Sequence, residues 1–416
     1  MISFLKVLCG RFDTVRVKPI LYLSYNGALE PIFQSQGLPY LKGLAKRKTQ
    51  VVLLTFEKKE DLRRTDPRDL EAIRNRLAGE EILWYWSRYH KWPPLLSTMW
   101  DASIGFIRAW RLARKYRVGL IHARGSIPAS FGWPVSRILN KPFLFDMRGF
   151  LAEEYADGGI WKRGGVIFHL VSGLERQFLR SSASVVVLTE RASAYLRQER
   201  LCPAEIPVTV IPCCVDLERF QRNNGQAATR SKEGFVLTYV GSLGTWYLLE
   251  QMLDFYRALK QRVPHASFQI VTQTRDRTLR NQLQRRGILV QEVPYDELPE
   301  RITSARAGIS FIKPAFSKMA SSPVKVGEYL AAGLPVVLNP NVGDTETLIK
   351  DNRVGVVVSE FKESCYEKAI EELLDLLKEG EALSKRCQRV ASAQLSLEEG
   401  ARRYQEIYES LLKGVS

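Results

Sequence analysis

Short apolar runs alternate with longer amphipathic stretches through the first half of the chain. The apolar runs have the length and the residue types of buried strands, and they cover residues 20–25, 51–56, 118–122, 143–146 and 185–189. Stretches with helical periodicity, such as residues 31–48 and 166–181, lie between them. Strands that alternate with helices in this way are typical of a parallel sheet in an α/β domain.

The same alternation begins again in the second half, after a polar, glycine-containing stretch at residues 222–234 that we interpret as a linker. Strands are expected at 235–240, 267–271, 288–291, 307–312, 335–338 and 354–358, and closing helices at 365–377, 380–391 and 396–413. The chain therefore predicts two doubly wound, Rossmann-like domains, which we assign to residues 1–205 and 206–390, followed by a C-terminal helical segment at 391–416. A ligand held by both domains would lie in the cleft between them.

Residues 82–117 depart from this alternation. They contain five of the eight tryptophans of the chain, together with a Pro-Pro pair and a basic end. No uncharged run reaches the 18 or so residues of a spanning helix. Tryptophan and arginine at helical spacing predict an amphipathic helix at a membrane interface. The alternative is a helix packed on the sheet with its basic end in solvent.

Charge is divided unevenly between the two halves of the chain. The whole sequence carries a net charge of +16, and residues 1–200 hold 33 Lys/Arg against 18 Asp/Glu, whereas residues 201–416 hold 28 against 27. The imbalance indicates an anionic partner for the first half, either an anionic membrane or nucleic acid. The six cysteines show no metal-binding spacing and no signal peptide is evident, so we expect a reduced, cytoplasmic chain.

One helix in the second half is marked at both ends. Ser322 is suited to the N-cap and Pro323 to the first helical position, while Gly333 is suited to a left-handed cap. Ser321, Ser322 and Lys325 would make the start of this helix an anion site, and Glu328 would share its face one turn later. The alternative is that Lys325 and Glu328 form an ordinary surface ion pair.

Polar or glycine residues also follow several of the predicted strands. Asp146, Arg148 and Glu154 follow the strand at 143–146, at the edge where open α/β sheets bind ligands, although Asp146 and Arg148 could instead form a structural salt bridge. Gly27 follows the first strand, and Gly241 with Ser242 follows the strand at 235–240. Glycine at such turns allows a phosphate to approach backbone N–H groups.

Residues 321–337 (SSPVKVGEYLAAGLPVV) resemble the donor-binding helix of glycosyltransferase family 4, whose members are retaining enzymes of GT-B fold. Further similarity follows in the order of the family, over roughly residues 20–410, at 26–28, 145–150, 210–220, 239–243 and 293–299. The chain looks like a divergent member near the bacterial transferases of polysaccharides and lipid-linked glycans. The resemblance implies two Rossmann-like domains that face each other across a cleft, with C-terminal helices returning toward the N-terminal domain.

Several positions depart from the family pattern. Ala320 stands where the first of two glutamates is usual, and Ser242 and Tyr247 stand where the family has phosphate-binding cations. We therefore expect Lys325, Lys313 or an arginine of the first domain, Arg124 or Arg148, to supply the positive charge. Asp146 takes the place of a histidine that many members carry.

The resemblance implies a hexosyltransferase-type enzyme (EC 2.4) that uses a nucleoside diphosphate sugar, UDP-sugar by default, in the synthesis of cell-surface polysaccharide. Its acceptor would be a glycan or a polyprenyl-linked sugar. The expected catalytic residues are Asp146, Arg148, Lys325 and Glu328. The expected donor-binding residues are Gly27, Gly241, Ser242, Lys313, Ser321, Ser322, Lys325, Glu328 and Tyr295.

No metal or cofactor is expected beyond the donor, because helix N–H groups, the two serines and Lys325 can stabilise the leaving diphosphate. We expect the protein to bind peripherally to the inner face of the cell membrane, with residues 82–117 as the contact, and not to bind nucleic acid. Two other functions fit part of the sequence. One is a basic nucleic-acid-binding protein, in which the aromatic residues of this segment stack on bases. The other is a sugar-nucleotide epimerase of GT-B fold.

Overall fold

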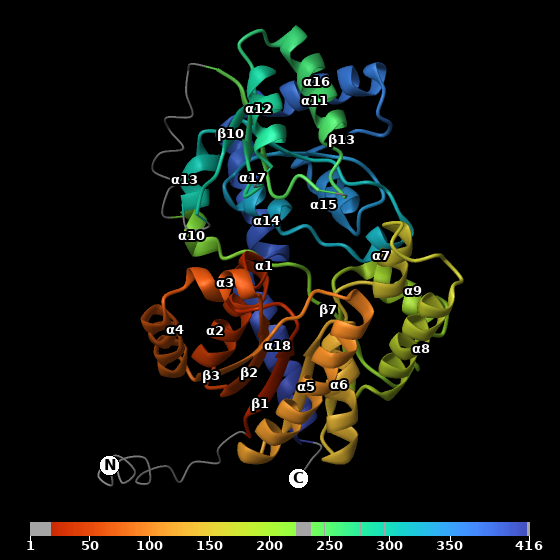
Figure 1. Ribbon diagram of the computed structural model, residues 1–416. Coiled ribbons are helices and arrows are strands. Elements are labelled where there is room, and N and C mark those ends of the chain that lie inside the picture. Colours follow the sequence, from red (N-terminus) through yellow and green to blue (C-terminus); the bar gives the residue numbers. More distant parts are fainter. Residues whose placement is uncertain (1–17, 222–233, 245, 275, 295–296, 414–416) are drawn as a thin grey trace.

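The computed structural model describes residues 18–221, 234–244, 246–274, 276–294 and 297–413 (Figure 1). Tyr295 and nearly all of the expected linker lie outside the described residues. Two sheets occupy the two halves of the chain, one above the other in the view of Figure 1. The expectation of an α/β protein with two doubly wound domains is therefore confirmed.

The first domain contains seven parallel strands in the order β3-β2-β1-β4-β5-β6-β7. Their bounds are β1 Ile20–Ser24, β2 Val51–Glu57, β3 Ile82–Arg88, β4 Leu120–Arg124, β5 Phe143–Asp146, β6 Ser184–Val187 and β7 Val208–Val210. The helices are α1 Pro31–Gln36, α2 Leu38–Lys46, α3 Lys59–Arg64, α4 Pro67–Gly79, α5 Pro94–Lys115, α6 Ser126–Ile138, α7 Leu151–Asp157, α8 Val166–Ser181 and α9 Glu190–Gln198. The short helix α10 Leu217–Gln221 packs against the second-domain helix α14 (Val324–Ala331). The sheet continues through β7, just past the expected domain boundary at residue 205.

The second domain contains six parallel strands in the order β10-β9-β8-β11-β12-β13, the order of a Rossmann fold. The strands are β8 Val236–Val240, β9 Ser267–Val271, β10 Leu289–Gln291, β11 Ala307–Ser310, β12 Val336–Leu338 and β13 Gly355–Val357. The helices are α11 Leu249–Arg262, α12 Arg277–Arg285, α13 Leu298–Thr303, the 3-10 helix η3 Phe316–Ala320, α14 Val324–Ala331, α15 Thr345–Asn352, α16 Glu363–Leu377 and α17 Glu381–Gln394.

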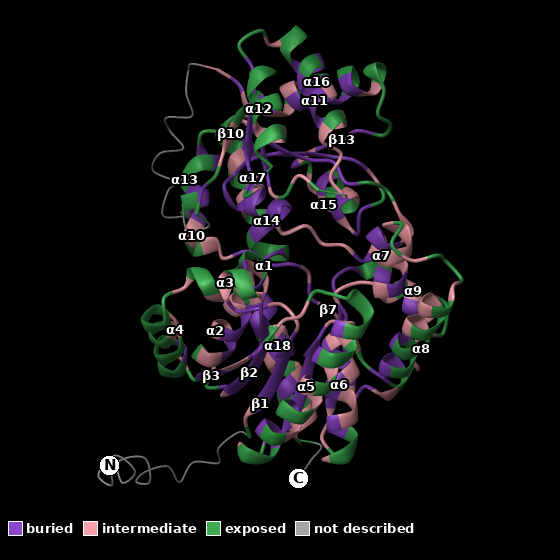
Figure 2. Cartoon of the chain, viewed as in Figure 1, coloured by how far each residue is buried: buried purple, intermediate pink, exposed green. Residues whose placement is uncertain are grey.

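Burial explains why the central strands of both sheets are continuous apolar runs in the sequence. Every residue of β1 and β2 is buried, as is every residue of β12 (Figure 2). Helices cover both faces of a parallel sheet, so side chains on either side of a strand are removed from water. Alternation of polar and apolar residues is therefore absent from these strands.

The last helix, α18 (Leu397–Lys413), crosses back to the first domain and packs against α2 and β4. Two of its tyrosines are buried there: Tyr404 donates a hydrogen bond to Asp146, and Tyr408 lies 2.7 Å from His122 Nδ1. In Figure 1 the helix, in blue, runs behind the lower sheet. The expected return of the C-terminal segment is confirmed.

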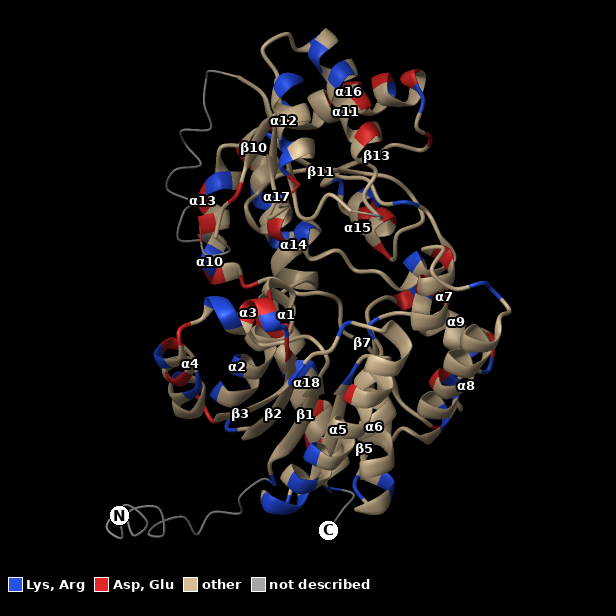
Figure 3. Cartoon of the chain, viewed as in Figure 1, with Lys and Arg blue, Asp and Glu red and all other residues tan. Residues whose placement is uncertain are grey.

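The segment at 82–117 differs from the expectation. Its first part is β3, an outer strand of the sheet in which Trp84 is buried, and only the second part is the helix α5. The interfacial helix was predicted for a segment that the Pro93-Pro94 pair divides, and the strand before that pair was not predicted. A strand buried on one face also places tryptophan in a core. Several large apolar residues around the start of α5 are nevertheless exposed: Trp92, Leu95, Leu96, Met99 and Trp100. The far end of the helix is basic (Figure 3).

Two local differences concern helix ends. The helix expected at 31–48 is divided at Gly37 into α1 and α2. Helix α14 begins at Val324 with Pro323 in the N-cap position, so Ser322 lies outside the helix and does not cap it. Gly333 has φ of +73° and follows the helix as expected of a left-handed cap.

Candidate active site

A cavity of about 470 Å³ lies between the two domains. It opens at the carboxyl ends of the strands, at the point in each sheet where the strand order reverses. Tyr25 and Asn26 follow β1, and Arg124 ends β4 beside them. Tyr247 follows β8, and Ile312 follows β11, on the opposite wall. Both domains therefore contribute the part of the fold that binds ligands in proteins of this architecture.

Basic side chains dominate the charged lining of the cavity. Arg124 and Arg148 come from the first domain, and Lys318 and Lys325 from the second. Glu154 is the one carboxylate among the lining residues. A cavity with this excess of positive charge, reached by the N-terminus of α14, is suited to a ligand that carries several negative charges.

Lys325 is buried at the start of α14, against two aromatic rings. Its Nζ lies 3.2 Å from the hydroxyl oxygen of Tyr239, 4.4 Å from the centroid of the Tyr239 ring and 3.7 Å from that of Tyr247. Burial lowers the pKa of Lys325 to about 7, and the nearby Glu328 carboxylate partly opposes this shift. Gly241 has φ of +134°, and a Cβ at this position would lie 2.8 Å from the Lys325 Nζ. The positive φ favours glycine there, and an added Cβ would also displace the end of the lysine side chain.

Lys318, on η3, is also held against an aromatic ring. Its Nζ lies 3.6 Å from the centroid of the Trp246 ring and 2.8 Å from Glu154 Oε1 of the first domain. Trp246 and Tyr247 are consecutive residues, so one short loop holds both cavity lysines by contacts between ammonium and ring. Lys318 was not predicted from the sequence. The signal was present, because the aromatic pair Trp246–Tyr247 includes a position at which a phosphate-binding cation was expected.

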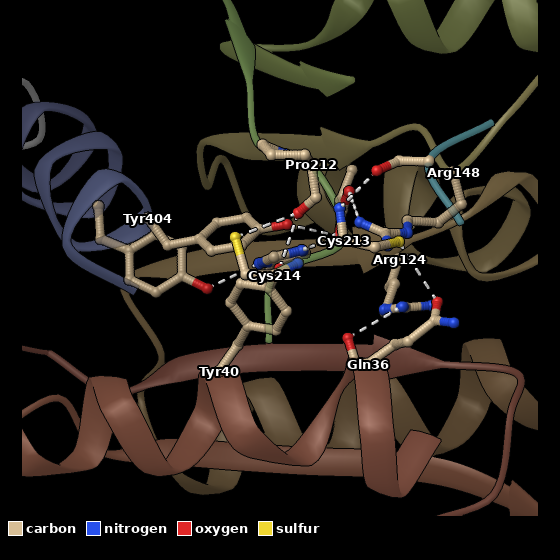
Figure 4. Close-up of polar contacts among 12 residues, drawn as sticks. Gln36, Tyr40, Arg124, Arg148, Pro212, Cys213, Cys214 and Tyr404 are labelled. Atoms are coloured by element: carbon tan, nitrogen blue, oxygen red, sulfur yellow. Dashed lines mark hydrogen bonds and ion pairs between the residues drawn. The ribbon is translucent and has the colours of Figure 1, made fainter. Parts of the chain in front are cut away.

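Polar contacts hold the two arginines in place (Figure 4). Arg148 lies with Nη1 3.4 Å from Asp146 Oδ1 and with Nη2 3.3 Å from the Cys213 sulfur. Arg124 donates from Nη2 to the backbone carbonyl of Gln36, at 3.0 Å. Both arginines line the cavity, as their mention among the possible cations predicted.

Asp146 is completely buried and is not among the lining residues. Its Oδ2 accepts a hydrogen bond of 3.0 Å from Tyr404 and lies 3.4 Å from His122 Nε2. Arg148 and His122 overcome the effect of burial and hold the pKa of this carboxyl well below its usual range. The ion pair that the sequence analysis kept as an alternative is therefore present. The geometry places Asp146 as a support for Arg148 and α18, outside the cavity lining.

Of the remaining predicted donor-binding residues, some line the cavity and others do not. Ser321 and Ser322 line the cavity, and Ser322 Oγ also accepts a hydrogen bond of 3.0 Å from the Cys213 N–H of the first domain. Glu328 is buried one turn into α14 and Lys313 is exposed, and neither lines this cavity. Ser242 is exposed, and its carbonyl oxygen accepts a hydrogen bond of 2.6 Å from Tyr239.

Two carboxylates accept hydrogen bonds from the backbone N–H groups of the loop after β1. The Gly27 N–H donates to Glu30 Oε1 at 2.9 Å, and the Ala28 N–H donates to Glu57 Oε1 at 2.6 Å. A Cβ on Gly27 would collide with the Glu57 carboxylate, which accounts for the glycine. The amide groups that were expected to face a phosphate are thus occupied in this structure, and Asn26 lines the cavity in their place.

Another buried carboxyl, which the sequence analysis did not single out, supports the first-domain wall. Glu175 of α8 accepts hydrogen bonds from the Ser126 hydroxyl at 2.7 Å and from the Leu151 N–H at 2.9 Å. Burial raises its pKa to about 7. Ser126 and Leu151 begin α6 and α7 and both line the cavity, so Glu175 fixes two parts of the wall relative to each other.

Comparison with known proteins identifies each domain. Residues 40–219 match the family model described as Glycosyltransferase Family 4, and residues 221–390 match the one described as Glycosyl transferases group 1. A search of curated proteins finds no match.

Among solved structures, similarity extends over nearly the whole chain. Sucrose-phosphate synthase from Thermosynechococcus elongatus has a TM-score of 0.72 at 17% identity, covering 95% of this chain and 100% of that one. Anabaena Alr3699/HepE, solved in complex with UDP and glucose, has a TM-score of 0.65 at 16% identity, covering 94% and 100%. WaaG, described as a glycosyltransferase of lipopolysaccharide biosynthesis, has a TM-score of 0.63 at 14% identity, covering 94% and 99%. At these identities the similarity shows the shared fold.

Proposed function

Because this chain belongs to the glycosyltransferases of the family 4 type, we propose that it transfers a sugar from a nucleoside diphosphate sugar to a glycan or lipid-linked acceptor, with retention of anomeric configuration. The observation that carries the proposal is the set of four cations that two domains direct into one cavity. Departure of the sugar leaves negative charge on a diphosphate, and fixed positive groups at that point lower the barrier.

The donor diphosphate is assigned to the start of α14. Lys325 and the two serines approach it from the second domain, while Arg124 and Arg148 approach it from the first. These charges are sufficient to balance a diphosphate, so the proposal includes no metal ion. Complexes of Alr3699/HepE with UDP and with UDP-glucose support UDP as the nucleotide.

The acceptor is assigned to the first-domain wall. An exposed apolar surface at the start of α5, formed by Trp92, Leu95, Leu96, Met99 and Trp100, accompanies the basic first half of the chain. Aromatic and aliphatic side chains beside cations suit the interface of an anionic membrane, where a lipid-linked acceptor would be presented. None of the described helices combines the length and the apolar character needed to cross a bilayer. We therefore propose peripheral binding to the membrane, consistent with a role in cell-surface polysaccharide synthesis.

A ligand panel in the presence of EDTA tests the donor assignment. Thermal shift is measured with UDP, GDP and their hexose derivatives for the wild type, Lys325→Met and Lys313→Met. Lys313 is an exposed lysine outside the cavity and serves as the matched control. We expect a nucleoside diphosphate to stabilise the wild type and the control, and to stabilise Lys325→Met much less. The assignment is wrong if no nucleotide binds, or if the two variants respond alike.

A further inference from the structure

Glu154 meets the second domain inside the cavity. It lies on α7, and its Oε1 is 2.8 Å from the Nζ of Lys318. Asp157, at the end of the same helix, accepts a hydrogen bond of 2.8 Å from the Ser317 N–H of η3. The two short helices are therefore docked on each other, and the carboxylate of one domain has a fixed place beside the ammonium of the other.

The Glu154 carboxylate retains capacity for a ligand. Its side chain is 40% exposed, whereas that of Lys318 is 7% exposed. Within the described part of the chain, Lys318 is its one hydrogen-bond or ion-pair partner. A carboxylate has two oxygens with about four acceptor sites, so most of its hydrogen-bonding capacity faces the cavity.

Among the described residues that line the cavity, the second domain contributes no carboxylate. Ala320, the last residue of η3, is 4% exposed and packs in the apolar cluster of the first domain. A charged side chain at this position would be buried in that cluster at a high cost. The carboxylate beside Lys318 therefore comes from the opposite wall.

We propose that Glu154 and Lys318 form the subsite for the transferred sugar, with Glu154 accepting hydrogen bonds from its hydroxyl groups and Lys318 donating to them. This inference rests on the proposed function, because it assumes that a diphosphate lies against Lys325. Trp246 is a positioning residue, since its ring holds the Lys318 ammonium in place. The pair carries no net charge, so the subsite suits a neutral hexose, and a uronic acid would bring a second carboxylate toward Glu154.

The affinity for UDP alone separates the sugar subsite from the diphosphate site. Isothermal titration calorimetry gives the dissociation constants of UDP and of UDP-glucose, UDP-galactose, UDP-N-acetylglucosamine and UDP-glucuronate. The quantity of interest is the ratio of the constant for UDP to that for the tightest UDP-hexose. Glu154→Gln is compared with Glu153→Gln, a neighbouring glutamate that pairs with Arg163 at 2.9 Å and does not line the cavity.

For the wild type we expect a neutral UDP-hexose to bind more tightly than UDP and than UDP-glucuronate. Glu154→Gln lowers the ratio about tenfold or more, the effect of losing a charge-assisted hydrogen bond, and leaves the affinity for UDP unchanged. Glu153→Gln changes neither. An unchanged ratio in Glu154→Gln, or equal weakening of UDP and UDP-hexose, overturns the subsite while leaving the donor site intact. If the wild type binds none of these nucleotides, the proposed function fails first and the subsite fails with it.

Discussion

Replacing Lys325 by methionine should make the unliganded protein more stable and the donor complex weaker. The lysine is buried against the rings of Tyr239 and Tyr247, where methionine fits without a charge. Folding must either remove its proton or bury its ammonium, and both cost free energy. A bound diphosphate would form an ion pair with the Lys325 ammonium, so the same residue stabilises the complex with the donor.

The size of the effect follows from the pKa of Lys325, which burial lowers from 10.5 to about 7. The unfolded chain keeps this proton up to its ordinary pKa, so between these two values the unfolded state binds more protons and stability rises with pH. At 1.36 kcal/mol per pKa unit, the lysine costs about 4 kcal/mol at pH 7 and about 1 kcal/mol near pH 9.5. Loss of the hydrogen bond to Tyr239 offsets about 1 kcal/mol of the gain in the variant.

Urea unfolding measures the stability difference at both pH values, and calorimetry with UDP measures the binding. We expect Lys325→Met to raise the free energy of unfolding by about 2–4 kcal/mol at pH 7, with a smaller gain at the higher pH. The dissociation constant for UDP should be about 10- to 100-fold higher in the variant than in the wild type. In the wild type this constant should increase as the pH rises above 7 and Lys325 loses its proton, and the variant should not show this increase. A variant that is less stable than the wild type at pH 7, and binds UDP equally well, would refute the reasoning.

Three further changes test other parts of the structure. Asp146→Asn should lower the free energy of unfolding by about 3 kcal/mol in urea, because it leaves the Arg148 guanidinium buried without its carboxylate; a change below 1 kcal/mol would contradict the supporting role. Gly241→Ala should weaken UDP binding about tenfold or more by calorimetry, since its Cβ would displace the lysine ammonium; Gly244→Ala, which meets no atom within 4 Å, is the control, and equal effects of the two would count against the steric argument. Replacing Leu96 and Trp100 by serine should abolish flotation with anionic liposomes while UDP affinity stays unchanged; flotation as in the wild type would exclude this surface.

The fold was predictable from the sequence because the central strands of both sheets are buried on both faces. Residues 143–146 and 267–271 are apolar runs bounded by turns, and both became strands with the expected bounds. The strand at 82–88 was missed because its tryptophans and its basic end resemble an interfacial helix. Whether a tryptophan-rich segment forms a strand, and which of its faces is buried, depends on the strand that pairs with it. That strand lies elsewhere in the sequence.

The site was only partly predictable, because distant parts of the chain form it. Lys325 could be identified from the start of its helix, and Arg148 from the end of its strand. The role of Asp146 depends on Tyr404, which lies 258 residues away and returns with the last helix. Lys318 becomes a cavity residue only through contacts with Glu154 of the other domain and with the Trp246 ring. No periodicity or spacing in the sequence records such contacts.

The aromatic pair Trp246–Tyr247 explains how this chain can lack the two cations of the family pattern. An aromatic ring attracts an ammonium without neutralising it, so each ring fixes the position of one lysine. The two lysines lie on η3 and α14, close to contacts with the first domain: Lys318 itself binds Glu154, and Ser322, just before α14, accepts a hydrogen bond from the Cys213 N–H. Binding of the diphosphate and closure of the cleft would then depend on the same side chains. Loss of either ring should therefore weaken donor binding even though no cation has been removed.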